Sequence, residues 1–294
     1  MGQKTNSTIF SLTTKKAEWK SKYIEKNVEE SSVLLFQDVE IRNYINRIFK
    51  IYGFLVHSCK IDYNYGNIIF LINLYNKKNE TEKFYKKDSK EKLSIPKFCQ
   101  NFSISNSKDL INFIINNILV IDLSLFLKNK TITVKTHNLN KKLQLLIKNT
   151  KTNFFEYKKI LKNFKRFLKN PIYKELLKIS FVAITEKNSA KLVAEAISNY
   201  FTKQKKRHGF ILFFIKKTFS SLIPLKMSQI KGIKIIIAGR FNGAPRSNKK
   251  IIKVGSVPLQ SFKSTISYYE DTAYTSNGTF GIKVWICENE NTSK

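Results

Sequence analysis

The side chains best suited to metal binding or redox chemistry are few and scattered in this sequence. No CxxC pair occurs among the cysteines, and only three histidines accompany them: Cys59, Cys99, Cys287, His57, His137 and His208. A structural zinc site needs four such ligands at defined spacing, and a disulfide framework needs cysteines in a compact pattern. We therefore expect packed or idle thiols, with no disulfide and no metal site.

Motifs of the common enzyme classes are also missing. No GxxxxGK[ST] occurs, because Gly66 is followed by no glycine until Gly209, so a cradle for a nucleoside triphosphate is absent. HExxH, GxSxG and GxGxxG do not occur, and the acidic residues do not gather into the pattern of a two-metal nuclease. The sequence predicts no catalytic residues, no cofactor and no enzymatic activity.

The remaining chemistry is that of positive charge. The 294 residues carry 53 Lys+Arg against 21 Asp+Glu, a formal net charge of +32. Such a charge repels itself in a free monomer and favours a polyanionic partner, either nucleic acid or an anionic membrane. The excess of Lys, Asn, Ile and Phe over Arg, Gly, Pro and Ala is typical of an AT-rich coding genome, of the kind that organelles carry.

The first elements that could position this charge follow from apolar spacing. A helix is predicted over 38–52, capped by Asp38 and closed by Gly53, and two strands follow over 54–61 and 68–75. A lysine-rich polar stretch without periodicity covers 76–107, which we interpret as an insertion. A helix from Ser107 to about 117 and a strand over 131–136 complete this small domain.

The middle of the chain reads as helical. The apolar stretch 110–127 contains three asparagines and Asp122, which are costly in a bilayer, so we expect a buried segment and no membrane span. Residues 138–187 are lysine-rich and amphipathic, and their interleaved aromatic residues are Phe154, Phe155, Tyr157, Phe164 and Phe167. We favour an aromatic face packed in the protein over aromatic rings stacked on bases.

The last third of the chain predicts a sheet with two helices. Helices are expected over 190–197, capped by Asn188 or Ser189, and over 211–222, and strands over 233–238, 251–254, 265–269 and 281–286. In the last strand Trp285 alternates with Val284 and Ile286, so we expect it to be buried or half-buried, without a stacked base.

Both ends of the chain resemble one known family, the universal third protein of the small ribosomal subunit (ribosomal protein S-three). At the N-terminus the matching residues are Met1-Gly2-Gln3-Lys4, then Phe10, Leu12, Trp19 and the stretch 38–45. Towards the C-terminus they are the stretches 190–197, 231–234, 238–240 with Gly243, and 255–259. The stretch 278–286, GTFGIKVWI, is the most specific.

The resemblance implies an α+β fold, a degenerate KH domain of type II followed by a family-specific α/β C-terminal domain. We expect an N-terminal extension over 1–35, the KH-like domain over 36–137 with its polar insertion near 76–107, a lysine-rich helical insertion over 138–187, and the C-terminal domain over 188–294. The implied role is that of a non-enzymatic constituent of the small-subunit head. Its implied partners are ribosomal RNA, messenger RNA at its entry channel, and the tenth and fourteenth small-subunit proteins, with no membrane.

Two departures from the family mark this sequence. A KH domain holds single-stranded backbone through a Gly-x-x-Gly loop, and no such loop exists between Gly66 and Gly209. The paired arginines of bacterial members are also absent from the predicted helix 211–222, which offers only Lys216 and Lys217. Lost motifs and internal expansion favour a mitochondrial version, encoded in the organelle genome, while plastid coding stays open.

The predicted contacts are basic residues on and beside turns, where long side chains reach phosphates. For ribosomal RNA they are Lys4, Arg42, Arg240, Arg246, Lys249, Lys250 and Lys253. For the messenger-RNA entry path they are Lys203, Lys205, Lys206, Arg207, Lys216 and Lys217. Gly239, Gly243 and Gly255 are expected to serve turns.

Two other classes share parts of this pattern. A mitochondrially encoded RNA-binding maturase or endonuclease-like protein would have the same composition, but it should carry LAGLIDADG-type or acidic metal motifs. A peripheral membrane protein could use residues 138–187 on anionic lipid, but it would not need the family motifs.

Overall fold

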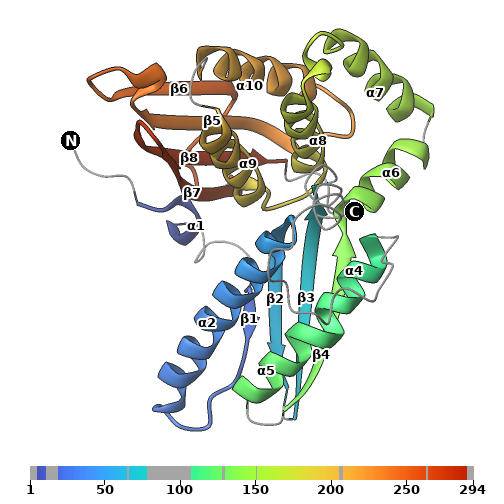
Figure 1. The fold of residues 1–294 in the computed structure, drawn as a ribbon, viewed down its shortest axis with the longest axis vertical. Helices are drawn as coiled ribbons and strands as arrows, with labels where there is room; N and C mark the ends of the chain where they lie inside the picture. The colour runs from blue at the N-terminus through green and yellow to red at the C-terminus, as the bar shows by residue number, and fades with distance from the viewer. Residues whose placement is uncertain are drawn as a thin grey trace, which may run out of the picture. The chain divides into compact units, whose positions relative to one another are not determined.

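The structure is a computed structural model, and it describes residues 5–10, 19–64, 66–77, 107–127, 130–149, 151–204, 208–262 and 264–289. The chain divides into two compact units, Glu18–Leu139 and a second one formed by Met1–Ala17 with Asn140–Lys294. Residues 138–187, expected as a separate insertion, thus fold for the most part in the same unit as the C-terminal sheet (Figure 1). Within the part of the chain that the structure describes, every helix is too short or too polar to cross a bilayer.

The unit Glu18–Leu139 is a four-stranded sheet with helices. Its elements are β1 (Ser21–Lys22), α2 (Glu30–Ile51), β2 (Phe54–Tyr63), β3 (Asn67–Asn76), α4 (Ser107–Ile114), the π-helical turn η2 (Ile115–Leu119), α5 (Val120–Phe126) and β4 (Thr131–Asn138). The strand order is β1-β2-β3-β4, with β2 and β3 antiparallel and the two outer pairs parallel. Its core joins the inner faces of the helices to the apolar residues of β2 and β3.

The start of α2 differs from the sequence prediction. Asp38 was expected to cap this helix, but the helix begins at Glu30 and Asp38 lies inside it. Its carboxylate accepts hydrogen bonds from Arg42 Nε at 2.8 Å and from Ser21 Oγ at 2.7 Å. The prediction was wrong because burial, on which the apolar period depends, begins only at Ile41; no residue of 30–40 is buried. The expected end is confirmed, since Gly53 has φ 78°.

The helix predicted from Ser107 is nine residues longer than expected. It continues through η2 into α5 without a loop. Ile111, Ile114 and Leu119 are buried, while Asn116 and Asn117 face solvent. The segment expected to be buried is thus a helix that is buried on one side only, since Ile121 and Leu125 are 52% and 76% exposed. Most of the polar insertion, 78–106, lies outside the described residues.

The other unit combines helices with a second four-stranded sheet. Its helices are α1 (Ser7–Phe10), α6 (Leu139–Asn149), α7 (Lys151–Asn163), α8 (Pro171–Thr185), α9 (Ala190–Lys203) and α10 (His208–Leu222), with short 3-10 turns η3 (Phe167–Lys169) and η4 (Phe241–Gly243). Its strands are β5 (Ile230–Gly239), β6 (Asn248–Gly255), β7 (Ile266–Thr275) and β8 (Gly278–Glu288), in the antiparallel order β6-β5-β8-β7. The predicted strands are confirmed, each with a few more residues.

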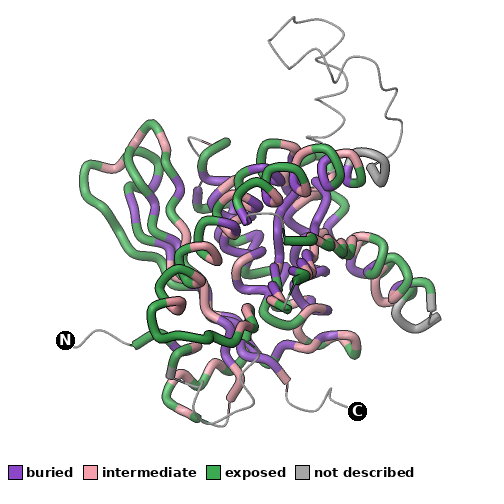
Figure 2. The backbone as a smooth tube through the Cα atoms, turned by 90° about the horizontal axis from the view of Figure 1, so that it is seen from below, coloured by how far each residue is buried: buried purple, intermediate pink, exposed green. Residues whose placement is uncertain are grey.

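Helices cover one face of this sheet. α9 packs on β7 and β8, α10 packs on β6, and α8 packs on both helices from outside. Buried residues therefore lie mainly in the strands and on the sides of the helices that face the sheet (Figure 2). α9 begins where it was expected, but neither predicted cap is formed: Ser189 Oγ donates instead to the carbonyl of Ala183 at 2.8 Å, and the Asn188 N–H donates to Glu288 Oε1 at 2.7 Å.

Only some of the aromatic residues of 138–187 are packed inside the protein, although we had expected this for all of them. Phe164 is fully buried, and its ring centroid lies 5.7 Å from that of Phe214 in α10. Phe167 contacts the same ring at 5.2 Å. Phe154 and Phe155 of α7 remain 53% and 70% exposed.

Candidate nucleic-acid interface

The face of the second sheet away from α9 and α10 carries most of its exposed basic side chains. Directly paired residues of an antiparallel sheet point to the same side, and successive residues alternate. On β5 the residues Ile233, Ile235 and Ile237 are fully buried towards the helices, so Lys234 and Ile236 point to the other side. We call this second side the open face. Its basic residues are Lys234, Lys249, Lys253 and Lys283.

One row across the open face joins lysines to aromatic rings. The register pairs Lys253 with Lys234, Lys234 with Trp285, and Trp285 with Tyr268. Lys234 Nζ lies 5.4 Å from the centroid of the Trp285 ring, and the Tyr268 ring lies 5.1 Å from it on the other side. Trp285 is half-buried between these neighbours, as expected. Cation–π contact of this kind orders the lysine beside the ring.

The next row contains the one acidic side chain of the open face within the paired strands. Lys283 Nζ lies 3.7 Å from Glu270 Oε2, and both side chains are more than half exposed, so the pair is worth little. The Tyr268 hydroxyl donates to the same carboxylate oxygen at 2.8 Å. Burial first, then this hydrogen bond and the charge of Glu270, raise the pKa of Tyr268 to about 12. The tyrosine is therefore neutral at physiological pH, and the four lysines leave the face positive.

The loop between β5 and β6 places two arginines at the edge of this sheet. Arg240 is exposed, and its Nε donates to the carbonyl of Ala244 at 2.8 Å. Arg246 is exposed further along the loop. The intervening turn η4 is held down by Phe241, which is buried and lies 5.4 Å from the ring of Phe280.

A reciprocal pair of hydrogen bonds attaches this loop to α10. The backbone N–H of His208, the first residue of α10, donates to Asn242 Oδ1 at 3.1 Å, and the N–H of Asn242 donates to His208 Nδ1 at 3.0 Å. His208 Nε2 lies 3.0 Å from the carbonyl of Gln204, to which it donates in the neutral tautomer that accepts at Nδ1. Asn242 adopts φ 56°, which asparagine tolerates better than most residues.

The residues predicted to contact ribosomal RNA lie at different places in the structure. Lys249 and Lys253 lie on the open face, but Lys250 points to the helix-covered side, where its Nζ lies 5.0 Å from the Phe241 ring centroid. Arg42 belongs to the other unit, and its guanidinium donates to Asp38, to Ser21 and to the carbonyls of Lys20 and Cys59, so it ties α2 to the sheet. Lys4 lies outside the described residues.

The residues predicted for messenger RNA are described in part. Lys203 is exposed at the end of α9, and Lys216 and Lys217 are exposed on α10, while 205–207 lie outside the described residues. Lys217 Nζ lies 5.6 Å from the ring centroids of both Phe164 and Phe167. That lysine is thus engaged with the protein's own aromatic residues.

Three residues of the open face were missed by the sequence prediction: Lys234, Lys283 and Tyr268. The signal was present, because Lys234 alternates with the isoleucines of KGIKIII and Lys283 with Ile282 and Val284. A period of two places each lysine opposite the apolar face. What the sequence did not contain was the register that brings them together.

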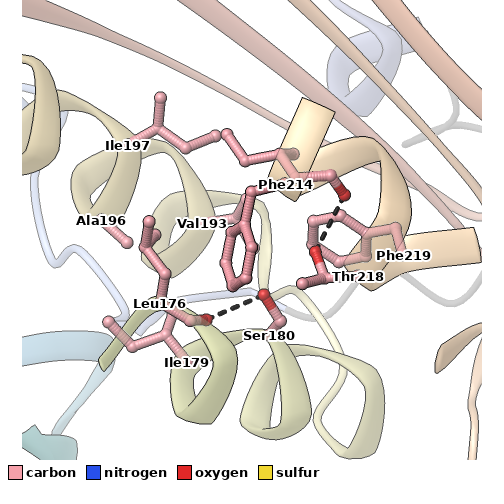
Figure 3. A pocket seen from close by; sticks show the side chains of 10 residues that line it. Leu176, Ile179, Ser180, Val193, Ala196, Ile197, Phe214, Thr218 and Phe219 are labelled. Atoms are coloured by element: carbon pink, nitrogen blue, oxygen red, sulfur yellow. Dashed lines mark hydrogen bonds between the residues drawn. The ribbon is translucent and has the colours of Figure 1, made fainter. Parts of the chain in front are cut away.

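Neither a metal nor a small-molecule site is found among the described residues. No cluster of three His, Cys, Asp or Glu side chains occurs there, and Cys59 and Cys287 are buried. A cavity of about 10 Å³ lies between α8, α9 and α10 (Figure 3). Its hydroxyls are already bound within their own helices, Ser180 to the carbonyl of Leu176 and Thr218 to that of Ile215. We regard it as a packing gap.

The three glycines that were expected to serve turns have two different roles in the structure. Gly255 has φ 72° and Gly243 has φ 79°, which agrees with turn positions. Gly239 serves packing instead, since a Cβ there would lie 2.3 Å from a ring carbon of Phe280.

A known protein family matches this chain within the unit that contains the second sheet. Residues 214–286 match the family model "Ribosomal protein S3, C-terminal domain", a stretch that runs from α10 to β8. The chain is 34% identical over 119 residues to "Small ribosomal subunit protein uS3" of Karelsulcia muelleri, which covers 40% of this chain and 50% of that protein. It is 30% identical over 135 residues to "Small ribosomal subunit protein uS3c" of Guillardia theta, covering 46% of this chain and 58% of that protein.

A third relative, "Small ribosomal subunit protein uS3c" of Cyanidium caldarium, is 36% identical over 124 residues, covering 42% of this chain and 56% of that protein. The chain therefore spans about half the length of the curated relatives that it matches. The domain match shows a ribosomal protein S3 C-terminal domain over residues 214–286, and the chain is similar to small-subunit S3 proteins over about half their length.

Proposed function

We propose that the chain is a non-enzymatic structural constituent of the small ribosomal subunit and binds ribosomal RNA through the open face and the 240–247 loop. The observation that carries the proposal is the register of the sheet, which brings Lys234, Lys249, Lys253 and Lys283 to one exposed side. Four lysines on one rigid surface supply the sequence-blind phosphate contacts on which such binding depends. The relatives' names point to the same particle.

The topology of the unit Glu18–Leu139 supports its assignment as a KH-like domain, but the unit lacks the Gly-x-x-Gly loop through which KH domains hold single-stranded RNA. Its order of helix, two antiparallel strands, helical segment and a strand parallel to β3 agrees with the KH fold of type II that the resemblance implies. The helical segment α4–η2–α5 is continuous where that fold would need a Gly-x-x-Gly loop. We propose that this unit has a structural role and does not hold single-stranded RNA through such a loop.

We further propose that Lys203 and Lys216 contact messenger RNA at its entry, on the resemblance and on their exposure at the end of α9 and along α10. Lysines provide point charges without a bidentate fork, which suits a strand that must slide. A message carrying photoreactive uridines along its entering segment should cross-link to peptides that contain these lysines. Cross-links to other proteins alone would contradict this role.

The proposed location is the mitochondrial ribosome, because the composition is that of an AT-rich organelle genome. Plastid ribosomes are the alternative. Fractionation of purified organelles followed by detection of the chain in their ribosomes decides between the two.

The RNA-binding proposal is tested with a matched pair of charge reversals on one strand. Lys253→Glu changes the open face, and Lys250→Glu changes the opposite side of β6. The full chain is titrated against a transcript of its own small-subunit ribosomal RNA at several salt concentrations. We expect Lys253→Glu to weaken binding by about tenfold and to lower the slope of log K against log salt by about 0.7 to 0.9, and Lys250→Glu to change neither. Equal effects of the two variants would contradict the assignment to the open face.

A further inference from the structure

The helix α7 carries lysines and exposed phenylalanine rings on its outer side. Phe154 and Phe155 are 53% and 70% exposed. Three lysines follow Phe155 at spacings of three, four and seven residues, and an α-helix brings such positions to one side. They are Lys158, Lys159 and Lys162, and all three are exposed. We call Phe155 and these three lysines the α7 face.

The α7 face points away from the protein. On the other side of the helix, the ring centroid of Tyr157 lies 4.9 Å from that of Phe181 in α8, and Ile160 is 5% exposed. At 3.6 residues per turn, the mean direction of the α7 face is roughly 180° from that of Tyr157 and Ile160. The helix is therefore anchored by its inner side, and its outer side is presented to a partner.

Positive charge is concentrated around the α7 face. Residues 141–169 contain ten basic side chains and a single acidic one, Glu156. The Oε2 atom of Glu156 is buried, and this residue lies roughly 100° around the helix from Phe155. The basic residues of 158–169 are all exposed, and none of them forms an ion pair with a described carboxylate: Lys158, Lys159, Lys162, Lys165, Arg166 and Lys169. The partner that fits this surface is an anion.

An anionic lipid surface fits the α7 face poorly. A helix that lies in a membrane surface buries a continuous apolar side in the lipid. The apolar side of α7 is occupied by its own protein, and among its described apolar residues only Phe154 and Phe155 are exposed.

An unpaired nucleotide offers both partners that the α7 face requires. Its phosphate matches a lysine, and the flat surface of its base matches a phenylalanine ring, which is how proteins bind single strands without reading their sequence. A base within a duplex is already stacked on its neighbours and offers only the phosphate.

We propose that the α7 face is a second RNA-binding site, which takes an unpaired stretch of ribosomal RNA: its lysines bind phosphates, and Phe155 stacks on a base. In Figure 1, α10 and α8 lie between α7 and the strand β6, so this site is separate from the open face. The inference rests on the proposed function, because the RNA is that of the same small-subunit particle.

The first test compares single-stranded with double-stranded RNA. The full chain, carrying Lys253→Glu to reduce binding at the open face, is titrated with a fluorescent uridine oligomer of about ten nucleotides and with an RNA duplex of the same length. Phe155→Ala removes the ring, and Phe155→Trp keeps an aromatic ring. Leu145→Ala on α6 is the matched control, since Leu145 is 60% exposed.

We expect Phe155→Ala to weaken binding of the single strand by about tenfold and of the duplex by less than about twofold, because only an unpaired base can stack on the ring. Phe155→Trp and Leu145→Ala should bind both RNAs as the parent chain does. An equal loss on both RNAs, or no loss, overturns the proposal. Binding to phosphatidylglycerol vesicles that Phe155→Ala abolishes would assign the face to lipid and overturn it as well.

The second test locates the contact in the particle. Purified small subunits are irradiated with ultraviolet light, which joins a base to an aromatic side chain in contact with it, and are then digested with trypsin and ribonuclease. We expect a nucleotide on the peptide 152–158, which contains Phe155. Nucleotides on peptides of the open face and none on 152–158 overturn the second site alone. If the chain is absent from small subunits, the proposed function fails with it.

Discussion

At the scale of single residues, Gly255 holds a backbone position that a side chain cannot occupy. Its φ is 72°, and a Cβ would lie 2.3 Å from the carbonyl oxygen of Lys231 and 2.9 Å from Gly232 Cα. Both obstacles are backbone atoms of the paired strand and cannot rotate away. We expect Gly255→Ala to lower the free energy of unfolding by about 2 to 4 kcal/mol, measured by urea denaturation followed by tryptophan fluorescence.

Gly281 supplies the control for this change. It lies on the open face of β8, its φ is not positive, and a Cβ there would meet nothing within 4 Å. Gly281→Ala should shift the unfolding free energy by about 0.5 kcal/mol or less. A similar loss in both variants would mean that chain entropy, and not the contact with Lys231, governs these positions.

At the scale of elements, the reciprocal bond between α10 and the β5–β6 loop should fix the loop that carries Arg240. Asn242→Ala removes the acceptor for the first N–H of α10 and places alanine at φ 56°, so we expect a loss of about 1 to 3 kcal/mol. Asn242→Gly removes only the acceptor and should cost less. The unfolding midpoints in urea provide the measurement.

The order of these two variants is the informative result. If Asn242→Gly is as damaging as Asn242→Ala, the hydrogen bond to His208 carries the effect and backbone strain does not. If neither changes stability, the loop is not anchored through this pair.

At the scale of the whole molecule, the uncompensated charge should dominate association with RNA. Binding by phosphate neutralisation releases counterions, so log K falls linearly with log salt. We expect the full chain to lose at least about a thousandfold in affinity for its ribosomal RNA between 50 and 200 mM salt. A nearly flat dependence from about 0.1 to 0.5 M would show that contacts other than phosphates dominate.

Local features of this protein were determined by the sequence itself. The apolar alternation of β5 and β8, the helical spacing from Ile41 to Ile48 and the turn at Gly53 each depend on neighbours within a few residues. The clustering of matching motifs at both ends of the chain also sufficed for the family resemblance. Such features can be read before folding because the periods of strand and helix are properties of the backbone.

The tertiary structure alone decided which charges share a surface. Lys250 and Lys253 are three residues apart yet face opposite sides, while Lys253 and Lys283 share the open face across a long sequence separation. The hydrogen bonds that Arg42 donates to Asp38 and to the carbonyl of Lys20 also became visible only when the structure placed these acceptors around it. The sequence also did not predict that α2 begins at Glu30, because no residue of its first half is buried and the apolar spacing of a buried helix is therefore missing there. Register and partnership depend on contacts between distant residues, which no local period encodes.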